Sequence, residues 1–564
     1  MDKFVYKRLP NAPEEHLSEK EKMEMEFGTL TSKDYLYEVS YDPNQPLNPA
    51  VDEPPYFVVI FTYLNYLILI IIGHLKDFFG KRFMPQYFEA VLPKNGYPPW
   101  YSAFESFYPR RLKKRLDDCF ARPIYGVPGR FVRCFDRISP DYNETFLYSG
   151  ELKPLLNLSS YNYLGFAQSI GSCTDSAIKS VEEYGTSSCG PRNQIGTCDL
   201  HKETEALVAQ FVGKDDAVMF SMGFGTNANL FTSLVNSKCL VISDSLNHSS
   251  IRFGIRLAGA AVKVFPHNDM KKLEQILRES ISQGQSKTHR PWKKIVVCVE
   301  GLYSMEGNLV DLPALVALRE KYKFYLFVDE AHSIGALGKS GRGVCDYFGI
   351  SPSKVDMLMG TFTKSFGAAG GYVAADQEII DRLRLDISTN VYGESMPPAV
   401  VTQINTSLRI IMGQINGDEG KQRLQRIAFN SRYLRLGLKR LGFIIYGVDD
   451  SPVVPLLLYA PPKMPAFSRM MYERGVAVVV VGYPATELIS SRVRLCVSAS
   501  LTKEDIDRIL TICDEIGDKL YLKFSSGISG GEKHPGDYKK GIPPRWSLKE
   551  VLERTPEDCK KPTY

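Results

Sequence analysis

The sequence predicts an α/β protein with three parts: an N-terminal membrane helix, a large unit built on a mostly parallel sheet, and a smaller C-terminal α+β unit. Three observations point to this fold. An uncharged apolar run occupies residues 56–73, strand and helix patterns alternate over residues 155–390, and the pattern changes after residue 390. With 564 residues, of which 44% are hydrophobic, the chain can bury a large core and should contain more than one domain.

Composition excludes several classes of function. A net charge of +5 over 564 residues is too small to indicate nucleic-acid binding. The 11 cysteines contain no Cys-x-x-Cys pair, and no histidine cluster has zinc spacing. We therefore expect no metal site and no disulfide framework, with thiols kept reduced and the catalytic part in the cytosol.

The N-terminus combines a polar arm with an apolar run. Residues 1–50 lack the pattern of a cleavable signal peptide, so we expect a cytosol- or lumen-facing arm. Residues 56–73 predict a helix that spans or inserts deeply into a membrane, with Asn65 as its polar interruption. A buried core helix and an in-plane interfacial helix remain alternatives. Acidic residues precede the run and basic residues follow it, which places its C-terminal side in the cytosol: Asp52, Glu53, Lys76, Lys81 and Arg82.

Residues 74–154 form a juxtamembrane segment that is rich in proline, aromatic residues and basic side chains. Its basic run is Arg110-Arg-Leu-Lys-Lys-Arg115. Basic side chains beside a membrane helix can hold anionic headgroups at about 1 kcal/mol per charge. A solvated helix face is the equally open alternative.

In the large unit, residues 155–390, one glycine turn suits a phosphate group. The predicted strand 217–220 leads through Phe220-Ser-Met-Gly-Phe-Gly-Thr-Asn227 into a helix. The unpaired backbone amides and the positive dipole end of such a helix attract a dianion. Gly223 and Phe224 are therefore candidate phosphate-binding residues, and the alternative is a tight turn that binds nothing.

The stretch Gly360-Thr-Phe-Thr-Lys-Ser-Phe-Gly-Ala-Ala-Gly-Gly-Tyr372 places one lysine among hydroxyls and glycines. The amine of Lys364 can form a Schiff base with an aldehyde cofactor. Thr361 and Thr363 can reach a phosphate if the backbone turns tightly. This stretch alone is equally compatible with a surface loop and a solvated lysine, so residues elsewhere must decide.

The deciding residues follow another strand. The apolar run 325–328 predicts a buried parallel strand, and Asp329 stands at its carboxyl end, where open α/β sheets bind ligands. A carboxylate there can pair with the protonated ring nitrogen of pyridoxal phosphate (PLP), while His332 can hydrogen-bond the phenolate oxygen. A helix-capping aspartate and a core histidine are the alternative, which the combination with Lys364 disfavours.

Together these motifs resemble the α-oxoamine synthases, PLP-dependent transferases of fold type I that condense an amino acid with an acyl-CoA and release carbon dioxide. The lysine motif is similar to that of the catalytic subunit of the eukaryotic members that make long-chain bases. The resemblance covers residues 56–520. It implies PLP as the cofactor, L-serine and a long-chain acyl-CoA such as palmitoyl-CoA as substrates, and a 3-keto long-chain base (3-ketosphinganine) as the product.

The same resemblance implies partners and a location. We expect a heterodimer with a related long-chain-base subunit that lacks the lysine, together with a small activating subunit and membrane regulators. The expected location is the endoplasmic reticulum membrane, with the catalytic part facing the cytosol.

The resemblance also assigns roles that the residues alone leave open. His248, which follows the predicted strand 239–242, would stack on the cofactor ring and can offer a proton to an acyl carbonyl. Ser304, after the predicted strand 295–299, would donate to the phenolate oxygen of PLP. A core histidine is the alternative for His248.

The C-terminal unit, residues 391–520, is expected to bind the substrate carboxylate. Strands are expected at 453–458, 476–481 and 493–497, and helices at 423–441 and 503–516. Arg494 lies on a strand and can hold a carboxylate in bidentate fashion, but Arg492 lies on the same face, so spacing cannot choose between them. The resemblance chooses Arg494.

Two further segments complete the expectations. The resemblance places Tyr161 and Asn162 near the amino-acid substrate, although Tyr161-Asn-Tyr-Leu-Gly165 is also compatible with a plain turn. Residues 521–564 form a tail, and its Gly- and Ser-rich part, 525–537, predicts a flexible linker.

Two other functions stay open from the sequence. The chain could be a non-catalytic scaffold on the same fold, or another α-oxoamine synthase that uses glycine or alanine with a short acyl-CoA. The presence of Lys364, Asp329, His332 and His248 argues against the scaffold. Product analysis distinguishes condensation of serine with a long-chain acyl-CoA from condensation of glycine or alanine with a short acyl-CoA.

Overall fold

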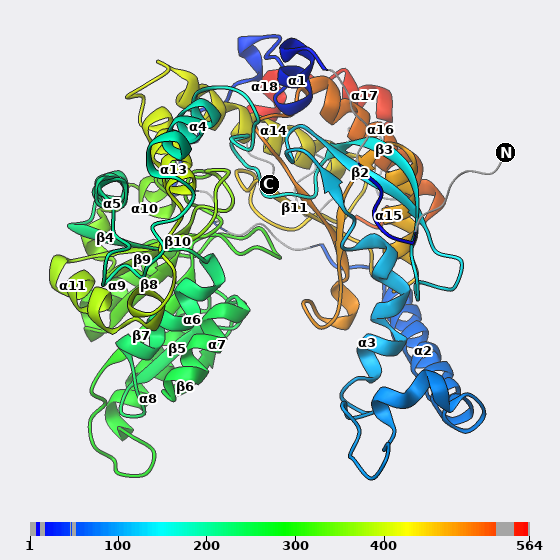
Figure 1. Ribbon diagram of the computed structural model, residues 1–564, viewed down its shortest axis with the longest axis horizontal. Helices are drawn as coiled ribbons and strands as arrows, with labels where there is room; N and C mark the ends of the chain where they lie inside the picture. The colour runs from blue at the N-terminus through cyan, green and yellow to red at the C-terminus, as the bar shows by residue number, and fades with distance from the viewer. Residues whose placement is uncertain (1–6, 12–16, 45–46, 48–51, 526–545, 562–564) are drawn as a thin grey trace.

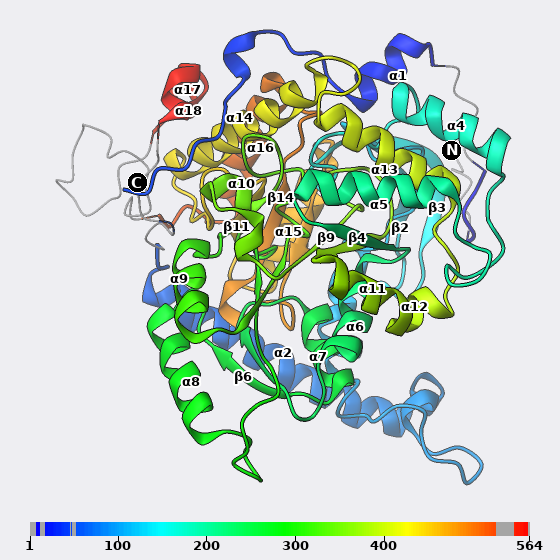
Figure 2. The ribbon, with the colours of Figure 1, turned by 90° about the vertical axis from the view of Figure 1, so that its left-hand side faces the viewer.

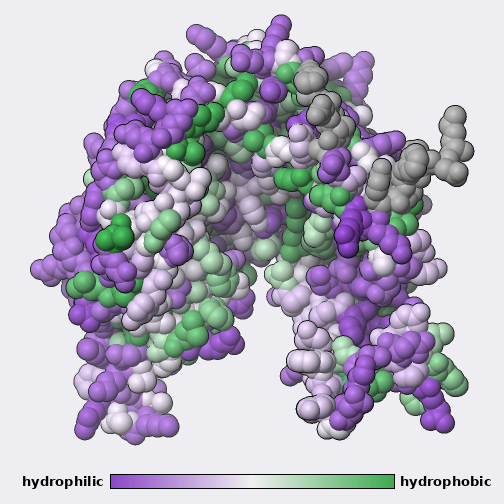
Figure 3. Space-filling view, viewed as in Figure 1, coloured by the Kyte–Doolittle hydropathy of each residue, from purple (hydrophilic) through white to green (hydrophobic). Residues whose placement is uncertain are grey.

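The computed structural model describes residues 7–11, 17–44, 47, 52–525 and 546–561. A large α/β unit and a C-terminal unit lie side by side, and the helices α2 and α3 project from below the C-terminal unit (Figure 1). The space-filling view is hollowed between the large unit and this projection (Figure 3).

A seven-stranded sheet of order β4-β10-β9-β8-β7-β5-β6 forms the centre of the large unit. Strand β10 is antiparallel to both of its neighbours, and the remaining pairs are parallel. The strands are β4 (Asp216–Phe220), β5 (Leu240–Asp244), β6 (Ala261–Phe265), β7 (Ile295–Glu300), β8 (Tyr325–Asp329), β9 (Met357–Thr361) and β10 (Gly371–Ala375). The predicted mostly parallel sheet is confirmed.

Helices cover both faces of this sheet, which explains why its strands read as continuous apolar runs. Along β7, Val297 and Val299 enter one core, while Val296 and Cys298 enter the core on the opposite face. The helices of this unit are α4 (Ser172–Tyr184), α5 (Asp199–Val212), α6 (Gly223–Leu234), α7 (Ser249–Ala258), α8 (Met270–Gln283), α9 (Leu312–Tyr322), α10 (Val344–Phe348), α11 (Gln377–Asp386), α12 (Ser388–Val391) and α13 (Pro398–Ile411), with the 3-10 turn η4 (Pro352–Lys354).

The C-terminal unit contains two small sheets, of order β11-β14-β13 and β1-β2-β3-β12. Its elements are β1 (Ile124–Tyr125), β2 (Phe131–Ile138), β3 (Leu147–Asn157), α14 (Glu419–Arg440), β11 (Val453–Leu457), α15 (Lys463–Glu473), β12 (Val476–Ala477), β13 (Val479–Val481), η5 (Leu488–Ser490), β14 (Arg492–Cys496) and α16 (Lys503–Lys519). The strand expected at 476–481 is divided, because β12 pairs with β3 whereas β13 pairs with β14. Strands from the segment 74–154 thus pack with the C-terminal unit, and the domain boundaries stay a prediction.

Helix α2 (Tyr56–Phe83) begins where the apolar run begins and extends beyond residue 73. It is long and apolar enough to cross a membrane, with a length of about 42 Å. One stripe is buried against the protein, and the other faces carry exposed apolar side chains; the buried residues are Val58, Thr62, Tyr66, Gly73 and Asp77. The elements η2 (Pro85–Val91), α3 (Phe107–Arg111) and η3 (Lys113–Cys119) bring the chain back to the C-terminal unit.

Charge pairing explains why the helix continues past the apolar run. Arg110 contacts Asp77 at 2.9 Å and Arg111 contacts the same carboxylate at 2.6 Å, although both arginines are more than thirty residues away in sequence. From the sequence alone the helix is expected to end before the first charges, because the arginines that neutralise Asp77 reach it only through the tertiary fold.

The N-terminal arm, with α1 (Glu19–Glu26) and η1 (Lys33–Tyr35), packs on the catalytic body. The Glu26 carboxylate accepts a hydrogen bond from the Ser169 amide at 2.8 Å, and the Tyr35 and Phe429 rings lie 5.5 Å apart. Figure 2 shows the arm running across the top of the molecule over α14. The arm and the catalytic body are therefore packed together as one unit.

The tail ends in two short helices, α17 (Leu548–Leu552) and α18 (Pro556–Lys560). They pack on α14, where the Arg554 guanidinium lies 3.8 Å from the Tyr433 ring and the Arg440 guanidinium lies 4.4 Å from the Trp546 ring. The end of the tail is thus folded rather than flexible. The predicted flexible stretch 525–537 lies outside the described residues, apart from Ser525.

Candidate active site

Four strands bring the predicted residues to one edge of the central sheet. Glu300 at the end of β7 pairs in register with Asp329 at the end of β8. At the end of β9, Thr361 pairs with Gly371, which also pairs with Phe220 at the end of β4. This edge holds the carboxyl ends of parallel strands, where α/β sheets bind ligands.

Asp329 is buried and held by two hydrogen-bond donors. Its Oδ2 accepts from Asn227 Nδ2 at 2.7 Å, and its Oδ1 accepts from the Ala331 amide at 2.9 Å. Asn227 also donates to Ser250 Oγ at 3.0 Å. Donors on both oxygens hold the carboxylate in one orientation, which suits pairing with a cationic ring nitrogen. Sequence reasoning missed Asn227, although it stands one helical turn after Gly223.

His248 is the N-cap of α7 and lies at the open side of the site. Its Nδ1 lies 2.8 Å from Ser250 Oγ, and its backbone amide donates to Glu300 Oε1 at 2.5 Å. Partial burial lowers the pKa of His248, so the imidazole is mainly neutral near pH 7. The edge of its ring meets Phe224, with ring centres 6.2 Å apart.

Glu300 is a second residue that sequence reasoning missed. It is buried beside Asp329, and this burial raises the pKa of its carboxyl well above the ordinary value, with the charge of Asp329 adding to the effect. The sequence did contain a signal for Glu300. It is a carboxyl residue at the end of a predicted strand, as Asp329 is at the end of another. Glu300 fixes the backbone from which His248 projects.

Lys364 lies in the turn between β9 and β10, with its Nζ 5.5 Å from the centre of the Tyr161 ring. Its side chain keeps some solvent exposure, yet the surrounding protein atoms lower its pKa to about 8. Burial is the main cause, and the charges of Asp329 and Glu300 oppose it. A sizeable fraction of this amine is therefore neutral and nucleophilic near neutral pH.

His332 is buried, with its Nδ1 2.8 Å from the hydroxyl of Tyr163 and its ring 5.4 Å from that of Tyr161. Burial, reinforced by the charges of Lys364 and Arg494, lowers the pKa of His332 well below its ordinary value. Burial also raises the pKa of Tyr163, so its phenol stays protonated and can donate to Nδ1. A neutral imidazole then keeps Nε2–H as a donor.

The two strand arginines have different surroundings. Arg492 donates to the Met305 carbonyl at 2.8 Å and lies 3.4 Å from Glu306 Oε1. Arg494 is held by the hydroxyl and the ring of Tyr161, and within the described part of the chain its buried Nε has no hydrogen-bond partner. Arg494 therefore retains hydrogen-bonding capacity for a carboxylate, whereas Arg492 is occupied.

Gly223 opens α6 directly against the threonines of the lysine motif. A Cβ at Gly223 would lie 2.7 Å from Thr361 Oγ1, so only glycine leaves this space open. Thr361 Oγ1 lies 2.8 Å from Thr363 Oγ1 and donates to the Gly370 carbonyl at 2.8 Å. Helix-start amides next to two hydroxyls form a cradle suited to a phosphate.

The contacts of two predicted residues, Asn162 and Ser304, do not test the roles expected of them. The side chain of Asn162 donates to the Pro128 carbonyl and accepts from the Ala167 amide, both at 3.2 Å, so it stabilises the turn. Ser304 is buried next to Met305, whose sulfur lies 3.8 Å from Arg494 Nη1. The substrate role of Asn162 and the cofactor role of Ser304 stay predictions.

The donor set fits PLP: an amine with a lowered pKa, a buried carboxylate, two neutral histidines and a phosphate cradle around one sheet edge. Within the described residues, no cluster of histidine, cysteine and acidic side chains could hold a metal ion. It is the amine, the carboxylate and the cradle that match an organic aldehyde cofactor.

Comparisons with known proteins agree with this geometry. Residues 153–512 match the aminotransferase class I and II family. The chain is 62% identical to serine palmitoyltransferase 2 of Kluyveromyces lactis, over 99% of this chain and 98% of that protein. It is 61% identical to serine palmitoyltransferase 2 of Saccharomyces cerevisiae, with the same coverage.

A solved structure is similar as well. The serine palmitoyltransferase of S. paucimobilis, with a bound PLP-myriocin aldimine, superposes with a TM-score of 0.65 at 26% identity. The match covers 75% of this chain and all of that one. The resemblance of the lysine motif is thereby confirmed, as are the fold and PLP as the cofactor. The chain belongs to the aminotransferase class I and II family and, within it, to the serine palmitoyltransferase 2 proteins.

Proposed function

We propose that this chain is the PLP-binding subunit of a serine palmitoyltransferase. The reaction joins L-serine to palmitoyl-CoA or another long-chain acyl-CoA, releases coenzyme A and carbon dioxide, and yields 3-ketosphinganine, the first intermediate of sphingolipid synthesis. The observation that carries the proposal is the meeting of Lys364, Asp329 and His248 at one sheet edge. The identity of 62% to a serine palmitoyltransferase 2 supports the choice of reaction.

Bound PLP supplies an aldehyde and an electron-withdrawing ring that stabilises negative charge on the serine α-carbon. We assign Lys364 to the aldehyde, because its lowered pKa leaves a reactive amine. Asp329, held by Asn227, is assigned to the ring nitrogen. The remaining assignments are His332 and Ser304 to the phenolate oxygen, and Gly223, Phe224, Thr361 and Thr363 to the phosphate.

The protein groups then divide the proton transfers and the positioning. Arg494 holds the serine carboxylate, and Tyr161 fixes the guanidinium for that task. Lys364 as a neutral amine removes the α-proton. His248 covers one face of the cofactor ring and, with Nδ1 held at Ser250, presents Nε2 toward the acyl carbonyl. Asn162 borders the substrate from the same turn as Tyr161.

We place the protein at the endoplasmic reticulum membrane, with its catalytic body in the cytosol. The chain before α2 and the chain after α3 both pack on that body, as the contact of Glu26 with Ser169 shows. A helix flanked in this way enters the bilayer from one side, with its exposed apolar face toward lipid. In this arrangement the C-terminal side of α2 faces the cytosol, as expected, and the N-terminal arm faces it as well.

The proposal includes a partner subunit. Enzymes of this fold form their sites at dimer interfaces, and we expect a related long-chain-base subunit without the lysine, joined by a small activating subunit and membrane regulators. Exposed apolar residues on α4 and the following loop support a protein interface: Ile178, Val181 and Ile195. The numbered names of the relatives fit an enzyme of several chains.

The test is product analysis of the purified chain together with its co-purifying subunits. With serine and palmitoyl-CoA we expect 3-ketosphinganine by mass spectrometry, and no product with Lys364→Ala. A product from glycine or alanine and a short acyl-CoA, but not from serine, would assign another reaction of this family. Unchanged product with Lys364→Ala would make the chain a scaffold.

A further inference from the structure

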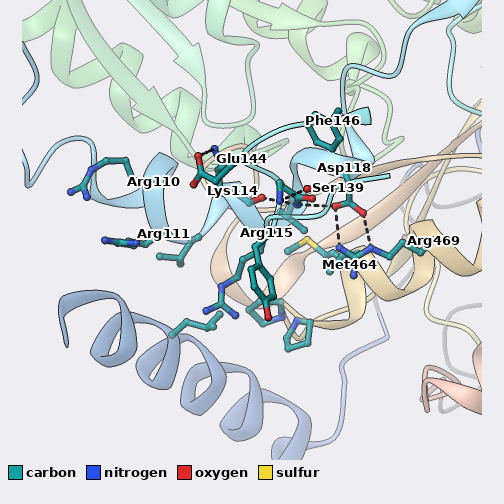
Figure 4. A pocket seen from close by; sticks show the side chains of 18 of the residues that line it. Arg110, Arg111, Lys114, Arg115, Asp118, Ser139, Glu144, Phe146, Met464 and Arg469 are labelled. Atoms are coloured by element: carbon teal, nitrogen blue, oxygen red, sulfur yellow. Dashed lines mark hydrogen bonds and ion pairs between the residues drawn. The ribbon is translucent and has the colours of Figure 1, made fainter. Parts of the chain in front are cut away.

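A cavity of about 1080 Å³ is lined by residues that do not belong to the strand-end site. It is enclosed by α2, α3, η3, the turn between β2 and β3, and α15 (Figure 4). None of the described residues that line it is assigned above to cofactor or substrate. Its wall includes Tyr66, Leu69 and Gly73 from the apolar helix.

The wall is strongly basic. Basic lining residues outnumber acidic ones by more than two to one, and they come from five separate elements of the fold and one loop. The basic residues are Lys76, Arg110, Arg111, Lys114, Arg115, Arg122, Arg137 and Arg469, and the acidic residues are Asp118, Glu144 and Glu473. A concave wall of one sign concentrates its field on a ligand of the opposite sign.

Existing ion pairs leave part of this charge uncompensated. Arg110 and Arg111 share a single carboxylate, Asp77, at 2.9 and 2.6 Å. Lys76 and Arg115 are exposed, and neither forms an ion pair with a described residue. The cavity therefore keeps positive charge that a phosphate can neutralise.

Two further guanidinium groups are fixed in place by aromatic rings. Arg137 lies 4.0 Å from the Phe146 ring, and Arg122 lies 3.8 Å from the Tyr472 ring. Among the described residues, the buried Arg137 Nε has no hydrogen-bond partner. Stacking reduces the side-chain entropy that these groups lose when they bind a ligand.

The surroundings indicate where the ligand comes from. The same helix that lines the cavity exposes Phe61, Leu64 and Ile68 on its surface, and the segment after it exposes Trp100 and Phe104. Apolar and aromatic side chains of this kind lie in the hydrocarbon and interfacial layers of a bilayer. Phosphate groups of lipids then lie at the level of the cavity.

We propose that this cavity binds the phosphate-bearing headgroup of an anionic membrane lipid, with the acyl chains of the lipid along α2. A phosphate can also be carried by a soluble molecule such as coenzyme A, so the experiment includes both sources. The site is independent of the condensation reaction and would exist even if the substrates differed.

The full-length chain, purified in detergent with its co-purifying subunits, is titrated with dihexanoyl phosphatidic acid and followed by native mass spectrometry. Dihexanoyl phosphatidylcholine is the zwitterionic comparison. We expect the phosphatidic acid to bind at least about tenfold more tightly. The double variant Lys76→Gln/Arg115→Gln should bind it about thirtyfold more weakly, as expected for two lost charges near an anionic group.

Matched variants distinguish binding in the cavity from a general effect of the protein's positive charge. Lys271→Gln/Arg278→Gln removes the same charge from exposed positions of α8 and should bind as the unchanged protein does. Lys76→Arg/Arg115→Lys keeps the charge and should also bind. If Lys76→Gln/Arg115→Gln fails to fold, Arg115→Gln alone should bind about fivefold more weakly.

Two results would overturn the proposal. Equal affinity of the unchanged protein and Lys76→Gln/Arg115→Gln for phosphatidic acid would remove the cavity as the binding site. Displacement of phosphatidic acid by an equal concentration of coenzyme A would assign the cavity to a soluble phosphate instead of a lipid.

Discussion

At the scale of residues, Asn227 holds the carboxylate on which the cofactor assignment depends. Its amide donates to Asp329 at 2.7 Å, and a hydrogen bond to a charged group is worth about 2 kcal/mol. Asn227→Ala should therefore lower kcat/KM roughly thirtyfold, measured by 3-ketosphinganine formation. Asn229→Ala is the matched control, because its amide donates to the Gly225 carbonyl on the same helix. Equal effects of the two substitutions would contradict the role given to Asn227.

The pKa of Lys364 determines how the rate of PLP uptake depends on pH. Only the neutral amine attacks an aldehyde, and a pKa of about 8 replaces the ordinary 10.5. Because the pKa is lowered, the neutral fraction reaches one half near pH 8 and levels off above about pH 9, whereas an ordinary lysine would still be mostly protonated there. We expect the rate of PLP uptake by cofactor-free protein, followed by absorbance, to be half-maximal near pH 8. A rate still rising steeply above pH 9.5 would indicate an ordinary solvated lysine.

The strand arginines offer a direct comparison. Arg494→Lys loses the planar fork that meets a carboxylate in bidentate fashion, so the KM for serine should rise by at least about tenfold. Arg492→Lys should leave that KM within about twofold, because Arg492 already bonds to Met305 and Glu306. Steady-state kinetics with varied serine decides between them. The reverse pattern would exchange the two roles.

The sequence predicted the site residues that local patterns locate, and it missed those that act through partners distant along the chain. Lys364 and Asp329 stand at strand ends, which local patterns locate. Asn227 and Tyr163 act through partners more than a hundred residues away, Asp329 and His332, and no local pattern reveals such pairs. The choice of Arg494 over Arg492 likewise needed the ring of Tyr161.

At the scale of elements, the buried strands of the large unit were predictable because each is covered on both faces and reads as an apolar run. Helix α2 was predicted too short, since Arg110 and Arg111 neutralise Asp77 only in the folded chain. The sequence did not reveal that β12 and β13 join different sheets, because the continuous apolar run 476–481 does not show which sheet each half joins.

The proposed one-sided insertion of α2 gives a prediction about topology. Epitope tags at the N-terminus and at the C-terminus should both be digested when protease is added outside sealed microsomes. The reason is that both flanks of α2 pack on the catalytic body, as Glu26 and Tyr35 do on the N-terminal side, and we place that body in the cytosol. A lumenal protein serves as the control for sealing. Protection of the N-terminal tag alone would show that α2 spans the bilayer.

At the scale of the whole molecule, one sheet edge in the large unit and one strand of the C-terminal unit share a single site. Lys364, Asp329 and His248 come from the first, and Arg494 comes from the second. In the proposed arrangement, the apolar helix α2 would hold this site next to the layer in which a long-chain acyl substrate and a lipid product dissolve. The central claim is that the aldehyde of PLP bonds to Lys364.

The most direct measurement is borohydride reduction of the purified enzyme, followed by peptide mass spectrometry. We predict one reduced pyridoxyl phosphate group on the peptide that contains Lys364, and loss of the cofactor absorbance in Lys364→Ala. Lys354, an exposed lysine of the same unit, should remain unlabelled. A label on another lysine, or no label on a protein that retains activity, would contradict the account.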